Sequence, residues 1–229
     1  MKVLELFAGT GQLSAAFRER GHKTFEVDWD TKFNSDLHID IGKLTTDMIL
    51  EKFGVPDVVW IAVDCTSFSL AAISHHRVKN KETGNLDPIS DYAKQCDEID
   101  QHVLEMLEEL RKMNPKLLFF IENPRAGLQK MTWMQPYEKY KYTVTYCKYL
   151  TDKPFEERRM KPTNIWTNHP NPKFIPPCNY GDPCHPRTPR GTTTHGTQGM
   201  KGAKERSTYP HMLIEHIVDI CEEYYKEGE

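Results

Sequence analysis

The sequence of 229 residues has no run of about 18 apolar residues, the length that a membrane-spanning helix needs. Its first residues also lack the basic segment and apolar stretch of a secretory signal. The six cysteines show no paired spacing, so we expect reduced thiols, each explained by packing, metal binding or chemistry. These absences predict a soluble protein of the cytoplasm, without a membrane partner and with one main domain.

The sequence also lacks the excess of basic residues that proteins binding nucleic acids usually carry, since its net charge is -3. The charge is unevenly distributed. Residues 151–210 hold 10 of the 30 basic residues and 5 of the 33 acidic ones, which gives this stretch a charge of +5. They also hold 10 of the 15 prolines and show no convincing apolar periodicity. This composition predicts a basic, loop-rich insertion; a solvated surface region is the alternative.

Apolar runs and helical patterns alternate along the first half of the chain. The predicted strands cover residues 2–7, 23–28, 57–63 and 116–121, and the predicted helices cover 12–20, 43–53 and 92–113. Continuous apolar strands are typical of sheets covered on both faces. The alternation therefore predicts a doubly wound, Rossmann-like α/β domain.

Beyond residue 132 the pattern changes. Two short strand patterns, 141–149 and 164–167, precede a terminal amphipathic helix over 212–225, and they predict an antiparallel edge to the sheet. We therefore divide the chain into three parts. A cofactor-binding and catalytic domain is expected at 1–145, a small recognition insertion at 146–206, and a C-terminal helix packing back on the first domain at 207–229.

The segment FAGTGQLS is a glycine turn between a predicted strand and a predicted helix. Glycines let the backbone approach a ligand, and free N–H groups at the helix N-terminus favour a polar or anionic head; a plain structural turn is the alternative. Asp28 follows about 20 residues later, where an acid commonly binds a ribose. Without a third glycine the turn favours an adenosyl cofactor smaller than a dinucleotide. The candidate cofactor residues are Phe7, Ala8, Gly9, Thr10, Gly11, Asp28, Trp29 (stacking on adenine), Asp40 and Ile41.

Two later motifs follow predicted buried strands. Cys65 lies in DCTSFS (Asp64 to Ser69), and Glu122 begins ENP (Glu122 to Pro124), so both side chains are expected at neighbouring carboxyl ends of strands. A thiol and a carboxylic acid of raised pKa suit nucleophilic and acid catalysis. A small buried cysteine and a carboxylate at a helix N-terminus are the alternatives. The polar residues 70–88 fit a mobile loop that closes over a substrate.

Taken in order with DIGKL, KPTNIWTN and ERSTYPHML, these motifs resemble the DNA (cytosine-5)-methyltransferases, most closely the small phage and prophage type. The resemblance implies S-adenosylmethionine as cofactor, double-stranded DNA with a flipped cytosine as substrate, a prokaryotic host cell, and a cognate restriction nuclease as a partner. It also implies that Cys65 attacks C6 of the base while Glu122 engages N3 and the exocyclic amine. Arg158 and Arg159 are the nearest candidates for the arginine pair that holds the base.

The sequence departs from that family at two points. Asp64 stands where the family has proline before the nucleophile. Three interpretations follow: the family tolerates the change, the enzyme transfers another group or acts on another substrate, or the protein is an impaired homologue that only binds DNA. A carboxylate there would raise the pKa of the thiol. The insertion is also short for sequence recognition, so RNA, single-stranded DNA and free nucleotides are alternative substrates.

The insertion suggests two further kinds of site. Its candidate phosphate contacts are Arg187, Arg190, Lys201 and Lys204, with Ser69 from the loop after Cys65 as a further contact. The candidate metal ligands are Cys178, Cys184 and His185, with Cys147, His169 and His195 as further ligands in reach. Zinc would stabilise a segment with few apolar residues, and scattered structural cysteines are the alternative.

Overall fold

The computed structural model describes residues 1–187 and 207–227. A seven-stranded sheet forms its centre, in the order β3-β2-β1-β4-β7-β9-β8. The strands are β1 (Lys2–Leu6), β2 (Lys23–Asp28), β3 (Leu37–His38), β4 (Val58–Ala62), β7 (Leu118–Pro124), β8 (Lys141–Thr145) and β9 (Pro162–Thr167). A separate hairpin pairs β5 (Arg77–Lys79) with β6 (Leu86–Pro88).

The helices are α1 (Gln12–Glu19), α2 (Thr46–Lys52), α3 (Ile73–His76), α4 (Asp91–Met113) and α6 (His211–Glu227). Short 3-10 turns are η1 (Ile41–Lys43), η2 (Leu128–Lys130), η3 (Thr132–Tyr140), η4 (Tyr146–Tyr149) and η5 (Phe155–Glu157). Side-chain caps mark the starts of two helices. The Thr45 hydroxyl accepts the Met48 N–H before α2, and the Ser90 hydroxyl accepts the Ala93 N–H before α4.

The strand order reverses beside β1, which pairs in parallel with both β2 and β4. β7 continues the parallel sheet, whereas β9 runs antiparallel to both of its neighbours, β7 and β8. The strand order and directions confirm the sequence prediction of a doubly wound α/β sheet with an antiparallel edge. In open sheets of this kind, ligands bind outside the carboxyl ends of the strands at the reversal.

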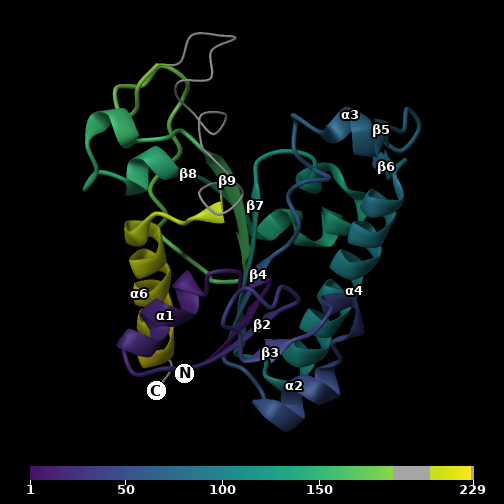
Figure 1. Cartoon of the computed structure of the whole chain (residues 1–229). Coiled ribbons are helices and arrows are strands. Elements are labelled where there is room, and N and C mark those ends of the chain that lie inside the picture. The colour runs from purple at the N-terminus through teal and green to yellow at the C-terminus, as the bar shows by residue number, and fades with distance from the viewer. Residues whose placement is uncertain (188–206, 228–229) are drawn as a thin grey trace.

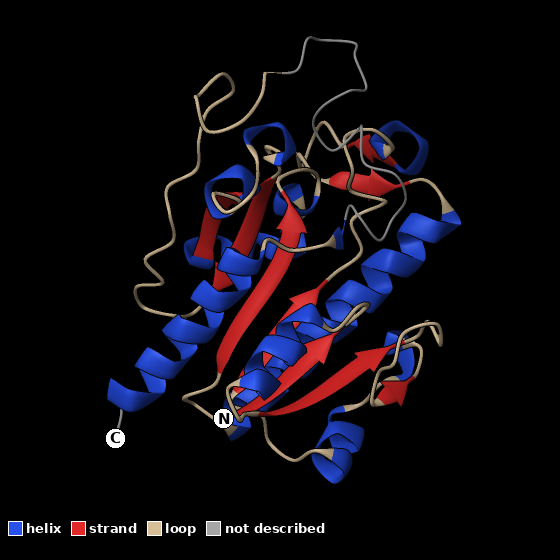
Figure 2. Cartoon of the chain, turned by 60° about the vertical axis from the view of Figure 1, so that its left-hand side comes forward, coloured by secondary structure: helices blue, strands red, loops and turns tan. Residues whose placement is uncertain are grey.

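Helices cover both faces of the sheet (Figures 1 and 2): α1 and α6 lie on one face, and α2 and α4 on the other. Successive residues of a strand point to opposite faces, so each strand contributes to two cores. Val58 and Trp60 of β4 pack in the cluster that includes α1 and α6, and Val59 and Ile61 pack in the cluster that includes α4. Burial on both faces explains the unbroken apolar runs of the sequence.

Three sequence predictions about individual elements are wrong. The strand predicted over 141–149 ends at Thr145, and the chain then turns into η4. Glu122 does not follow its strand, because β7 continues to Pro124 through pairing with β9. The predicted loop over 70–88 contains α3 and the β5–β6 hairpin. The short strand β3 had no apolar pattern long enough to predict it.

Candidate active site

The glycine turn joins β1 to α1 at the strand-order reversal. Phe7, Gly9 and Gly11 all have positive φ angles, of 58°, 52° and 61°. A Cβ on Gly11 would lie 2.6 Å from the Glu26 carboxylate, which would have to shift, and the positive φ also favours glycine there. A Cβ on Gly9 would meet no heavy atom within 4 Å, so the backbone at Gly9 faces open space that a ligand can enter.

Asp28, at the end of β2, holds this turn in place. Its buried carboxylate accepts the N–H of Gly9 at 2.7 Å and the N–H of Asp30 at 2.8 Å. The adjacent Trp29 is 68% exposed, which leaves its ring available for stacking. The acid expected to bind a ribose therefore lies directly beside the open face of Gly9.

The other candidate cofactor residues occupy the same edge of the sheet. Ala8 is buried and donates its N–H to the Val27 carbonyl, while Thr10 is exposed. Asp40, two residues beyond β3, accepts the Gly42 N–H at 3.0 Å and so begins η1, and Ile41 is buried behind it. The structure thus brings the candidates together around the ends of β1, β2 and β3.

Carboxylates lie beneath the turn, and they change one sequence expectation. Glu5 is buried and accepts the Ser14 N–H at 2.9 Å, so at least this N–H of the first turn of α1 is already bonded within the protein. Burial raises the pKa of Glu5 to about 7. Glu26 is also buried and pairs with Arg18. These acids beside the turn disfavour a phosphate and favour a ligand with positive charge.

Cys65 lies three residues beyond β4, with its side chain exposed. The chain around it is tied to the segment that follows β7. Asn123 donates its amide to the carbonyls of Val63 and Asp64, at 3.2 Å and 3.1 Å. Gly127 donates its N–H to the Phe68 carbonyl at 3.0 Å. The two predicted motifs, DCTSFS and ENP, are therefore joined by direct hydrogen bonds.

Asp64 makes three contacts through its carboxylate. One oxygen accepts the Tyr92 hydroxyl at 2.7 Å, and the other accepts the Ser67 N–H at 3.0 Å and lies 3.6 Å from the Cys96 sulfur. Tyr92 and Cys96 both belong to α4. Asp64 thus anchors the Cys65 loop to a helix.

Arg77 strengthens the same attachment from within the predicted loop. Its guanidinium is buried and bonds both oxygens of Asp97 on α4, at 3.0 Å and 2.6 Å. It also bonds the Ser67 carbonyl and lies over the Phe68 ring, 3.9 Å from its centroid. Sequence reasoning missed this residue, because a cation in a polar stretch gives no signal that it will be buried.

Glu122 is buried in β7 and receives two tyrosine hydroxyls from distant segments. Tyr146 donates to one carboxylate oxygen and Tyr209 to the other, each at 3.4 Å. Tyr209 also donates its backbone N–H to Gln12 at the start of α1, so it connects the glycine turn with Glu122. Burial raises the pKa of Glu122, and the positive charge of Lys161 and the two hydroxyls oppose that shift. The two tyrosines were not among the sequence candidates.

The thiol of Cys65 responds to the same charges. Although the residue is exposed, the surrounding protein removes the thiol partly from water; this effect, then the negative charges of Asp64 and Glu122, raise its pKa, while Lys161 lowers it. Lys161 also lies over the ring of Tyr146, 4.7 Å from the centroid. Cys65, Glu122 and Lys161 are therefore electrostatically coupled, as a nucleophile and an acid in one site would be.

The remaining candidates are less closely joined to this site. Arg158 donates to the carbonyls of Thr151 and Lys153, so it closes its own loop, and Arg159 is half-buried beside it. The Ser69 hydroxyl accepts the Ala71 N–H at 3.3 Å, and the exposed Arg187 donates to the Gly181 carbonyl at 3.2 Å. The candidates Arg190, His195, Lys201 and Lys204 lie outside the described residues.

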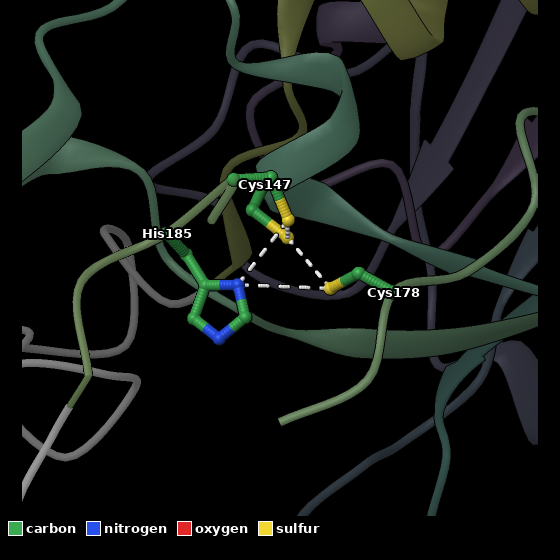
Figure 3. A group of neighbouring side chains, drawn as sticks. Cys147, Cys178 and His185 are labelled. Carbon is green, nitrogen blue, oxygen red and sulfur yellow. Dashed lines mark hydrogen bonds between the residues drawn. The ribbon is translucent and has the colours of Figure 1, made fainter. Parts of the chain in front are cut away.

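A second group of chemically active side chains lies near Tyr146. The ligand atoms of Cys147, Cys178, Cys184 and His185 are all within 4.8 Å of one another, close enough to hold a metal ion (Figure 3). Burial lowers the pKa of His185, which favours the neutral ring that binds metals. The structure thus joins the three predicted ligands with Cys147. His169 instead packs its ring against Tyr224.

In comparisons with known proteins, neither a protein-family model nor a curated protein matches the chain. Within residues 1–187 and 207–227, no helix combines the length and the apolar character needed to cross a membrane. The function is therefore inferred from the arrangement of the site itself.

Proposed function

We propose that this protein transfers a methyl group from S-adenosylmethionine to C5 of cytosine in DNA. One observation carries the proposal. Hydrogen bonds of Asn123 to the chain before Cys65, and of Tyr209 to Glu122 and Gln12, tie the segments that hold the thiol, the buried acid and the open glycine turn to one another. This arrangement matches the activity that the motifs imply, in a fold whose ligands bind at that end.

The turn suits S-adenosylmethionine for chemical reasons. The open face of Gly9 admits the ligand, Asp28 beside it can accept ribose hydroxyls through its remaining lone pairs, and the exposed Trp29 offers a stacking surface. The buried acids Glu5 and Glu26, whose pKa values burial raises, disfavour a further negative charge beside the turn, which is consistent with a ligand that carries ammonium and sulfonium charges. When bound, this cofactor supplies an electrophilic methyl group.

Cys65 makes C5 of cytosine reactive. The thiolate attacks C6, a C6–S bond forms, and electron density moves through the ring to C5, which is otherwise too weak a nucleophile. After C5 has been methylated, a base or water removes its proton and the C6–S bond breaks, which restores the thiolate. The exposure of the Cys65 side chain allows a flipped base to approach it.

Glu122 supplies the complementary acid. Burial raises its pKa, so the protonated form can donate to N3 of the base while Cys65 attacks C6. Tyr146 and Tyr209 hold the two carboxylate oxygens in a fixed orientation. Asn123, the next residue, holds the chain before Cys65, so the acid and the nucleophile keep their relative position.

Methyl transfer is tested with the full chain, a mixed-sequence DNA duplex and isotopically labelled S-adenosylmethionine. We expect label in DNA with the parent protein and none with Cys65→Ala. Cys221→Ala, which removes a buried thiol of α6, is the matched control and should keep the activity. Label that is incorporated equally with and without Cys65 would overturn the mechanism.

Mass spectrometry of nucleosides from cells that express the protein separates the remaining alternatives. The proposal expects 5-methylcytosine in DNA. A cytosine of another mass would indicate transfer of a different group, the same product in RNA would change the substrate, and unmodified nucleosides would favour a DNA-binding protein without catalysis. Among these alternatives, the contacts of Asp64 with α4 favour a methyl-transfer reaction in which Asp64 holds the Cys65 loop in position.

A further inference from the structure

The Cys147 cluster consists of side chains from two separate parts of the chain. Cys147 lies in η4, and Cys178, Cys184 and His185 lie in the segment 168–187. Cys147 is fully buried, Cys178 is 6% exposed and His185 is 3% exposed, and the three cysteines are free thiols. Buried thiols and an imidazole that meet in this way require an explanation beyond apolar packing.

The distances within the cluster approximate the edges of a coordination tetrahedron. With metal–sulfur bonds of about 2.3 Å and metal–nitrogen bonds of about 2.0 Å, a tetrahedral zinc ion separates two sulfurs by about 3.8 Å and sulfur from nitrogen by about 3.5 Å. The sulfur of Cys147 lies 3.2 Å from that of Cys178 and 3.7 Å from that of Cys184. Nδ1 of His185 lies 3.3 Å from the Cys184 sulfur and 3.7 Å from the Cys178 sulfur.

The orientation of His185 also fits metal coordination. Figure 3 shows its ring directed toward the sulfurs of the cluster. The other ring nitrogen, Nε2, is buried and has no hydrogen-bond partner among the described residues. The thiols that face Nδ1 are the polar groups that this ring meets among the described residues. A metal ion among the sulfurs would bind Nδ1 and leave the ring proton on Nε2.

We propose that Cys147, Cys178, Cys184 and His185 bind a zinc ion. Three thiolates and one imidazole complete a tetrahedral set, which is typical of structural zinc sites and leaves no open position for a substrate. On binding, the thiols lose their protons to solvent and no redox step is needed. The zinc proposal is independent of the proposed methyl transfer, because metal content is measured without a substrate.

The ion would add a further attachment to a segment that is already tied to the rest of the protein, for example through the Ile175 N–H, which the Tyr149 hydroxyl accepts at 2.9 Å. Residues 168–187, all of them described, form no helix or strand. Apart from the cluster, Cys178 is tied to the end of β8 by its N–H, which the Thr145 hydroxyl accepts at 3.0 Å. Tyr146, between Thr145 and Cys147, donates to Glu122. Zinc would therefore attach the insertion directly beside the buried acid of the candidate active site.

Metal analysis of the full, untagged chain tests the proposal. Protein purified without chelator should contain about one zinc ion per chain, and Cys178→Ser and Cys184→Ser should lose most of it. Cys221→Ala is the matched control, since it removes a buried thiol that is not one of the four candidate ligands and should keep the metal. A zinc content near zero in the parent chain, even from medium with added zinc, would overturn the proposal, as would full zinc in both serine variants.

A measurement on the parent chain covers the case in which the serine variants fail to fold. After zinc is exchanged for Co²⁺, the protein should show the visible absorption of tetrahedral, thiolate-bound cobalt. Alkylation of the chelator-treated protein, followed by mass spectrometry, should label Cys147 and Cys178 as thiols. Absence of the cobalt absorption contradicts the proposal, and so does a Cys147–Cys178 disulfide in protein purified under air without chelator.

Discussion

The two halves of the candidate active site are built in different ways. The glycine turn is mostly local: Asp28, which fixes it, lies 19 residues from Gly9 and on the adjacent strand. The Cys65–Glu122 half is assembled from the separate segments that carry Cys65, Glu122, Tyr146 and Tyr209, and Tyr209 lies 87 residues from the acid that it contacts. A local motif carries its own geometry, whereas the second half depends on packing of the whole chain. Variants of each half should therefore fail differently.

The largest effect is expected from Glu122→Gln. The amide cannot donate the proton that the proposed mechanism requires at N3, so methyl transfer should fall by about 10²- to 10⁴-fold. Folding should be retained, because the amide is nearly isosteric. Rates of methyl transfer and of Cys65 alkylation, measured on the same preparation, check this, and Glu138→Gln on the surface is the control. Unchanged methyl transfer would remove Glu122 from the mechanism.

Arg77→Met is expected to act on stability. It leaves the Asp97 carboxylate without its buried partner and frees the Cys65 loop from α4, which should cost about 3–5 kcal/mol of unfolding free energy. Arg111→Met, which removes a more exposed pair with Glu108, should cost about 0–1 kcal/mol. Urea unfolding compares the two variants. Equal losses would mean that Arg77 does not hold the loop.

The glycine turn offers a smaller and more local test. Alanine is strained at both Gly9 and Gly11 because φ is positive, at a cost of about 1–2 kcal/mol. At Gly11 the new methyl group also meets Glu26, so Gly11→Ala should unfold more readily than Gly9→Ala. Gly9→Ala should instead weaken S-adenosylmethionine binding, since its methyl group enters the open space. Urea unfolding measures the stability of the two variants, and calorimetric titration measures their binding of S-adenosylmethionine. A less stable Gly9→Ala, or weaker binding in Gly11→Ala, would contradict the assignment of the open space to Gly9.

The contrast between the halves also explains what could be predicted from the sequence. Apolar runs predicted the doubly wound sheet, and FAGTGQLS with Asp28 predicted the turn, because a strand, a turn and the next strand end follow one another in the chain. The prediction that Cys65 and Glu122 belong to neighbouring strands followed from the same alternation. The pairing of β4 with β7 confirms that the two strands are adjacent, although Glu122 lies within β7 and not after it.

The contacts that complete the site could not be predicted. Tyr146 and Tyr209 reach Glu122 through β8 and the segment before α6, and no local pattern marks either hydroxyl. Arg77 lies in a polar stretch that indicated a loop, and its burial depends on Asp97 of α4. Cys147 was one of several ligands in reach of the metal group, and only the fold selects it over His169.

The smallest effects should come from the charges around Cys65. Its pKa is raised, so at neutral pH the thiol is mostly protonated, and alkylation should accelerate as pH rises toward that pKa. Asp64→Asn removes a negative charge, lowers the pKa of the thiol and should speed alkylation severalfold at neutral pH. Lys161→Met removes the opposing positive charge and should slow it.

Tyr92→Phe distinguishes charge from anchoring in this last comparison. It removes the hydroxyl that Asp64 accepts but leaves the carboxylate charged. If the charge of Asp64 controls the pKa of the Cys65 thiol, the pH profile of alkylation should shift to lower pH in Asp64→Asn and not in Tyr92→Phe. Only the first variant removes the negative charge that repels the thiolate. A matching shift in both would mean that release of the loop, and not loss of the charge, changes the surroundings of the Cys65 thiol, and that Asp64 acts on Cys65 through position alone.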